Sequence, residues 1–294
     1  VLRNGLAGHE LRLDATPPSQ VGRRFTLQGE FRQPLLAQRS DWRRWSGTAF
    51  AELPQADAAA LRPWLPALPV EVPQGEGALR AWVEVAAGEV KSVQADLALR
   101  KVQLRFPGRP AQALPFERLQ GRVSAARDGR TLRFTAEQLS FASGSIDWPA
   151  TRWNLSLRER AAEGEPVAVN AAASAAPPSF DGGELTADRI DIGALATLAA
   201  QLPLGEAVKQ LLIELAPSGQ VNNLAARWDG PLDAPRSYTL KAQASALAIA
   251  AKPAADANRL GRPGWRNATL DIEASENGGR AQLASSITTA LTVL

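Results

Sequence analysis

Residues 79–106, LRAWVEVAAGEVKSVQADLALRKVQLRF, alternate between apolar and polar side chains along almost their whole length. Leu79 and Val83 belong to the apolar set, whereas Arg80 and Glu84 belong to the polar set. A period of two places alternate side chains on opposite faces of a β-strand. The stretch therefore predicts a pair of strands with one apolar and one polar face, joined by a turn at its only glycine.

The second strand of this pair contains a break in the pattern. Val93, Leu97 and Leu99 carry the apolar set at odd positions, and after Arg100 and Lys101 the apolar residues move to even positions. One extra residue in a strand produces such a shift, and it is what a β-bulge supplies. We therefore expect a bulge here and a strand that bends.

Similar alternation recurs through most of the chain. Its apolar members are Phe25, Leu27 and Phe31; Leu119 and Val123; Leu132, Phe134 and Ala136; Trp153, Leu155 and Leu157; and Leu270, Ile272 and Ala274. Turn sequences such as Asp128-Gly129 separate these runs, as in β-hairpins. Strands do not alternate regularly with helices, so the sequence predicts a mainly β fold built from an antiparallel meander rather than βαβ units.

Two short helical insertions interrupt the strands. Asp57 can cap a helix near residues 57–65. Asp191 can cap the first half of a broken helix pair over residues 191–216, which Pro203 divides. In the second half four residues have the i, i+3, i+4, i+7 spacing of one helical face. They are Val208, Leu211, Leu212 and Leu215.

The chain of 294 residues is long enough for one large or two smaller domains. An Ala-rich stretch at residues 161–180 contains three prolines and predicts a boundary between segments 1–178 and 179–294. No Met occurs, not even at position 1, which indicates a piece of a longer protein.

Few residues offer catalytic chemistry. The chain has no Cys and a single His, His9, which we interpret as a surface residue rather than a catalytic or metal-binding one. Asp188 and Asp191 could form a carboxylate pair, but Asp191 already has a role as a helix cap. The net charge of +3 is spread without blocks of like charge, which disfavours nucleic acid as a partner. We therefore expect no enzyme activity, no metal and no cofactor.

Several segments resemble one family. They are residues 182–191 ahead of the broken helix pair, residues 228–231 (WDGP) with Pro235 and Tyr238, residues 45–50 (WSGTAF), and residues 264–271 (GWRNATLD). Together they are similar to AsmA-like envelope proteins, most closely the YhdP branch. The resemblance implies an elongated, curved, U-shaped antiparallel β-groove. It also implies a periplasmic location, attachment to the inner membrane by an anchor outside this sequence, and phospholipid transport between the inner and outer membranes.

On this interpretation the apolar member of each strand lines the groove and contacts lipid tails. The candidates are Leu79, Val83, Val85, Val93, Leu97, Leu99, Leu132, Phe134, Leu155, Leu157, Leu270 and Ile272. For each of them, an ordinary closed core is the alternative. A second reading is a non-catalytic scaffold whose apolar face binds outer-membrane or other envelope proteins. A third is a carbohydrate-binding sandwich that uses exposed Trp residues, of which Trp82 stands on the otherwise polar face of its strand.

Overall fold

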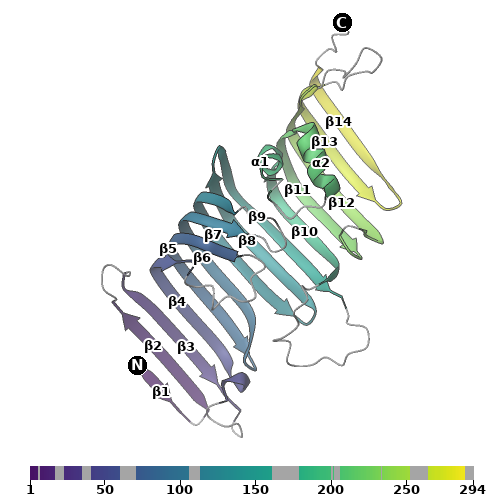
Figure 1. Ribbon diagram of the computed structural model, residues 1–294. Helices are drawn as coiled ribbons and strands as arrows, with labels where there is room; N and C mark the ends of the chain where they lie inside the picture. The colour runs from purple at the N-terminus through teal and green to yellow at the C-terminus, as the bar shows by residue number, and fades with distance from the viewer. Residues whose placement is uncertain are drawn as a thin grey trace. The chain divides into compact units, whose positions relative to one another are not determined.

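The computed structural model describes residues 1–5, 7–16, 23–34, 41–59, 71–105, 113–160, 179–199, 201, 206–232, 234–251 and 264–288. Strands dominate these residues, and only short helices accompany them (Figure 1). The elements are β1 (Leu2–Asn4), β2 (Gly8–Ala15), β3 (Phe25–Arg32), the 3-10 helix η1 (Trp42–Arg44), β4 (Ser46–Asp57), β5 (Glu71–Ala86), β6 (Glu89–Arg105), β7 (Leu114–Asp128), β8 (Thr131–Ser143), β9 (Ile146–Glu159), β10 (Phe180–Asp191), α1 (Ile192–Leu198), α2 (Glu206–Leu215), β11 (Ser218–Asp229), β12 (Ser237–Ile249), β13 (Trp265–Ser275) and β14 (Gly278–Thr288).

All fourteen strands belong to one antiparallel sheet, and their order in the sheet is their order in the chain. The sheet is not closed, because β1 and β14 each have one neighbour among the described strands. Only two short α-helices lie within the described ranges. This confirms the mainly β fold and the meander of hairpins that the alternating sequence predicts.

The chain divides into two compact units, which we describe separately. Unit 1 contains residues 1–127, 134–152 and 201–203, and unit 2 contains the remainder. The boundary passes through β8 and β9. The division at residue 178 that the sequence suggests stays a prediction.

Bulges interrupt several strands. The register between β5 and β6 shifts close to Lys101, whose φ of 50° is positive, which confirms the bulge expected there. Further positive φ values occur inside strands at Gln138, Asn223, Ala246 and Asn267. The pairing of β11 with β12 shifts across Asn223, and that of β12 with β13 shifts across Ala246. Bulges increase local twist and bend the strand that carries them.

Two glycines allow neighbouring strands to approach closely beside bulged residues. Gly77 has a φ of 147°, and a Cβ added to it would lie 2.2 Å from the carbonyl oxygen of Ala98. Gly219 has a φ of 120°, and a Cβ there would lie 2.8 Å from the carbonyl oxygen of Ala246. Only glycine fits both the conformation and the space.

The broken helix pair forms as two separate helices. Asp191 caps α1 as expected, because its carboxylate accepts a hydrogen bond of 2.9 Å from the backbone N–H of Ala194. α1 contacts β10, β11 and α2. Asp188, the other member of the possible carboxylate pair, lies within β10 and is exposed.

The apolar face predicted for α2 is partly wrong. Leu212 is buried and Leu215 is half-buried, but Leu211 is 56% exposed. Lys209 is buried instead, and its Nζ lies 3.9 Å from a carboxylate oxygen of Glu206. The orientation of α2 therefore buries the stem of a lysine rather than one leucine of the predicted stripe. The side chain of Val208 lies outside the described residues.

The helix expected near residues 57–65 is described only at its start. Asp57 ends β4, and its carboxylate accepts a 3.0 Å hydrogen bond from the backbone N–H of Ala59, which forms a turn with Ala58. Residues 60–65 lie outside the described residues.

His9 is buried, so its interpretation as a surface residue is wrong. Its side chain is 6% exposed and stacks on the indole of Trp45, with the ring centroids 4.1 Å apart. Its Nδ1 lies 3.0 Å from Oδ1 of Asn4. The indole of Trp45, which lies between η1 and β4, stacks on the imidazole and explains its burial. The sequence around His9 does not indicate this contact.

Candidate functional site: the apolar face of the sheet

The strand registers of unit 1 collect apolar residues into rows that cross the sheet. Residues paired across strands lie on the same face, so each row is a band of neighbouring side chains. The rows are Leu2, Leu11, Gly29, Ala49, Val83, Val93 and Ala125; Leu13, Leu27, Ala51, Ala81, Ala95 and Val123; and Leu53, Leu79, Leu97 and Gly121. Every member of these rows is apolar or glycine. We call this surface the apolar face of unit 1.

Most of the apolar face of unit 1 is reached by solvent. Leu79, Val83, Val85, Val93 and Leu97 are half-buried. A side chain in the middle of a two-layer sandwich would be covered by the second layer. All described strands of unit 1 belong to one sheet, so no second sheet among the described residues is available to cover this face.

The apolar residues near the Lys101 bulge are different. Leu99 is 8% exposed, and Val102 is 1% exposed. Leu114 and Phe116, which pair with this part of β6, are also buried. Phe116 makes an edge-on contact with Phe141, whose ring lies 5.1 Å away. Unit 1 thus combines an open apolar area with a small packed core at one end of β6 and β7.

Unit 2 repeats the arrangement. Its apolar rows are Leu157, Gly183, Trp228 and Tyr238; Leu155, Leu185, Ala226, Leu240 and Ala274; Ala242, Ile272 and Ala281; and Ala244, Leu270 and Leu283. Leu155, Leu157 and Ile272 are half-buried. The apolar face of unit 2 is therefore also contiguous across β9–β14.

A small core closes part of the apolar face of unit 2. Ala244, Leu247 and Ala268 are buried, and Ile192 of α1 packs against them. Leu270 packs against the same cluster. Thus α1 covers the strands near Leu270. Ile272, the next residue of β13 on the same face, does not belong to that cluster.

Two of the predicted lining residues lie on β8. Leu132 and Phe134 are both half-buried. Their separation by one residue places them on the same face of β8.

The opposite face of each unit is polar and carries ion pairs between neighbouring strands. In unit 1, Arg122 binds Asp96 through two hydrogen bonds of 2.6 and 3.0 Å. These bonds lower the pKa of Asp96 below its usual value. In unit 2, Lys241 donates to Glu273 over 3.0 Å. Exposed pairs of this kind add little stability, but they keep one face solvated.

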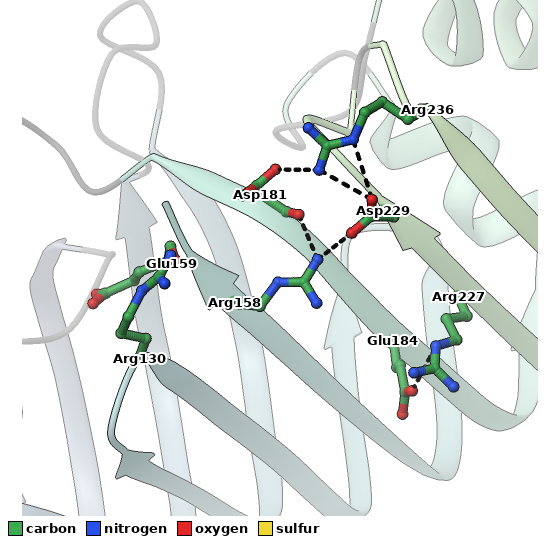
Figure 2. A network of polar contacts seen from close by, with 8 residues as sticks. All are labelled: Arg130, Arg158, Glu159, Asp181, Glu184, Arg227, Asp229 and Arg236. Atoms are coloured by element: carbon green, nitrogen blue, oxygen red, sulfur yellow. Dashed lines mark hydrogen bonds and ion pairs between the residues drawn. The ribbon is translucent and has the colours of Figure 1, made fainter. Parts of the chain in front are cut away.

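A network of charged residues joins the ends of β9, β10 and β11 in unit 2 (Figure 2). Arg236 donates to Asp181 over 3.0 Å and to Asp229 over 3.0 and 3.1 Å. Arg158 donates to Asp229 and, over 2.8 Å, to the carbonyl oxygen of Asp181. Hydrogen bonds from Arg236 and then Arg158 lower the pKa of Asp229.

This network connects the ends of neighbouring strands and is not an anion-binding site. Two carboxylates already neutralise its two guanidinium groups. The backbone N–H of Arg236 also donates to the carbonyl oxygen of Asp229, which holds the segment between β11 and β12 against the strand end. A phosphate group would have to displace a carboxylate to bind here.

Other kinds of site are not found in the described part of the chain. No group of three or more His, Asp or Glu residues there could hold a metal ion. No helix among the described residues is both long and apolar enough to cross a membrane.

Sequence reasoning missed many members of the apolar face. Leu11 and Leu13, each 43% exposed, extend it to β2, and Ala49 and Ala51 extend it across β4. Residues 46–53 do alternate, but small residues such as Ala give a weak apolar signal.

The fold and the contiguous apolar face of each unit define a class of protein: a non-closed antiparallel meander in which one face of the sheet is apolar in each unit. Within that class, residues 1–289 match the model of the family described as YhdP protein, and the chain belongs to this family. Comparison with curated proteins and with solved structures gives no significant match.

Proposed function

We propose that the chain is a periplasmic segment of an inner-membrane-anchored protein that carries phospholipid between the inner and outer membranes along its apolar face. Membership of the YhdP family supports an envelope role. The observation that carries the proposal is the contiguous row structure, in which apolar residues of successive strands lie side by side and stay half-exposed. Apolar surface of this extent, in contact with water, is a mark of a binding site.

The mechanism that fits this surface is passive. Each acyl methylene that leaves water contributes about 0.8 kcal/mol, so a lipid tail gains from contact with any row of the face. Successive rows are chemically alike, consisting of Leu, Val, Ala and Gly. A lipid moving from one row to the next therefore exchanges equivalent contacts, and no deep minimum holds it. The polar headgroup stays in water. This mechanism assigns no catalytic role to the chain.

Native mass spectrometry of gently purified protein tests the proposal. Leu97 and Ala98 are neighbours on β6 that face opposite sides of the sheet. We expect phospholipid to bind the unaltered chain and the Ala98→Asp variant, and to bind the Leu97→Asp variant much more weakly. Absence of bound phospholipid from the unaltered chain and from both variants would contradict the proposed lipid transport. Loss of a protein partner in Leu97→Asp, without any bound lipid, would favour the scaffold alternative instead.

A further inference from the structure

The polar face of unit 1 contains a hollow with a volume of about 700 Å³. It crosses five neighbouring strands, β3 to β7. Its lining consists of three adjacent rows of paired residues. The rows are Gln28, Phe50, Trp82, Gln94 and Ser124; Glu30, Thr48, Glu84, Ser92 and Ala126; and, between them, Gly29, Ala49, Val83, Val93 and Ala125.

The alternation of the strands places this hollow on the polar side. The first two rows project from the polar face, and the middle row projects from the apolar face. The neighbouring residues of β3 on the apolar face, Leu27 and Phe31, do not line the hollow. The hollow is therefore a furrow between two rows of polar-face side chains, with the backbone of the middle row as its floor.

An aromatic pair forms part of one wall of the furrow. The rings of Phe50 and Trp82 lie 5.3 Å apart and are tilted by 44°. Trp82 is 36% exposed, although it is a large apolar side chain on a polar surface. The strand registers confirm that Trp82 lies on this face, in the same row as Gln94. The cross-strand contact of this pair stabilises the sheet, and the exposed indole of Trp82 also offers a flat apolar surface to a ligand.

Neutral hydrogen-bonding groups and two carboxylates complete the walls. Gln28, Gln94 and Thr48 present amide and hydroxyl groups, and the hydroxyl of Ser92 donates to Glu84 over 3.1 Å. Among the described residues that line the furrow, the charged side chains are Glu30 and Glu84, so this lining carries negative charge and no positive charge. It is therefore suited to a neutral ligand with many hydroxyl or amide groups and unsuited to phosphate, sulfate or nucleic acid.

We propose that this furrow binds a neutral, extended glycan with hydroxyl and acetamido groups. The C–H face of a sugar ring stacks on an exposed indole, while its polar edge bonds to amides and hydroxyls. Five strands spaced by about 4.8 Å give a furrow length of about 19 Å, which suits several sugar rings in a row. An extended peptide fits less well, because it binds sheets by pairing with a free strand edge, whereas the furrow crosses paired strands.

This inference goes beyond the proposed lipid function, since the furrow and the lipid-facing rows are on opposite sides of the same strands. A glycan site here would let the chain hold a polysaccharide of the envelope while its other face carries lipid.

Titration calorimetry of the 294-residue chain with a hexamer of β-1,4-linked N-acetylglucosamine tests the site. We expect saturable binding that weakens by about tenfold or more in Trp82→Ala, the usual effect of truncating an aromatic anchor. Trp42→Ala is the matched control, because Trp42 is a more exposed indole in η1 that does not line the furrow. It should leave binding unchanged, and a sulfated glycan should not bind.

A second variant distinguishes loss of glycan binding from a folding defect caused by Trp82→Ala. The double variant Gln28→Ala with Gln94→Ala removes two amides and keeps the aromatic pair, so it should also weaken binding while circular dichroism stays unchanged. No binding of the hexamer, or equal binding by the unaltered chain and by both furrow variants, would overturn the proposal. Binding of an unstructured peptide in place of the hexamer would overturn it too. Phospholipid retention should be the same in all of these variants, which separates failure of the glycan site from failure of lipid binding.

Discussion

The replacement Val83→Asp distinguishes an open apolar face from a closed core. Val83 lies in the middle of β5 and pairs with Ala49 on one side and Val93 on the other, yet it stays half-buried. On an open face the new carboxylate remains hydrated. The cost is then mainly the lower strand propensity of Asp and lost contacts with neighbours, about 1 kcal/mol.

Val102→Asp supplies the reference for a closed site in the same unit. Val102 is 1% exposed on β6, so a carboxylate there loses its water. Burial of an unpaired charge is among the few changes that cost about 4 kcal/mol or more. That is a large share of the roughly 5–15 kcal/mol by which domains are stable. The two valines carry the same side chain, and the comparison therefore isolates the effect of the environment.

Urea denaturation followed by circular dichroism measures both variants. We expect the midpoint of Val83→Asp to stay near that of the unaltered chain and that of Val102→Asp to fall steeply, with the slopes unchanged. A lipid tail that covers the carboxylate introduced by Val83→Asp would have to desolvate it, so phospholipid retention should fall in this variant even though the fold persists. Equal destabilisation by the two substitutions would refute the open face and leave a sealed core in its place.

Three further predictions concern the fold. Gly77→Ala should destabilise the chain by more than Gly129→Ala in urea titrations, because a Cβ at Gly77 meets a carbonyl oxygen. A Cβ at Gly129 meets open space, so Gly129→Ala should cost only the strain of the positive φ at that position, about 1 kcal/mol. The pKa of Asp229 is lowered in the folded chain, so its ion pairs add stability above about pH 4 that is lost as the pH falls further. Arg236→Gln should therefore be less stable than the unaltered chain near pH 6, and the gap should narrow at about pH 3; a constant gap would contradict the ion-pair explanation. Asp191→Ala should cost about 1 kcal/mol through loss of the α1 cap, whereas Asn at this position should retain most of it, and equal losses would argue against capping.

Local patterns in the sequence were sufficient to predict the meander of strands and one of the bulges. Alternation in residues 79–106 depends only on near neighbours, and the shift of phase at Lys101 shows directly in the letters. The cap at Asp191 is equally local, since the residue precedes its helix by one position.

Features that depend on distant residues could not be predicted. His9 is buried because Trp45 stacks on it, and nothing near His9 in the sequence indicates that partner. Leu211 is exposed because the contacts of α2 with its surroundings, rather than its own spacing of leucines, set its rotation.

The candidate site was predicted as a class of positions rather than as a surface. The alternation identified residues such as Val83 and Val93, and the strand registers then placed them in one row with Gly29 and Ala49. Burial could not be predicted position by position: Leu99 follows the same alternation as Leu97, but it lies beside the packed core at the bulge and is buried. Whether each candidate contacts lipid remains a prediction.

Site-specific photocrosslinking at positions 93 and 94 tests the central claim most directly. Val93 and Gln94 are consecutive residues of β6, so a crosslinking amino acid at either position samples the same depth along the strand but opposite faces. We predict a phospholipid adduct, identified by mass spectrometry, from position 93 and none from position 94. Adducts of equal yield from both positions, or none from position 93, would contradict a lipid-carrying apolar face.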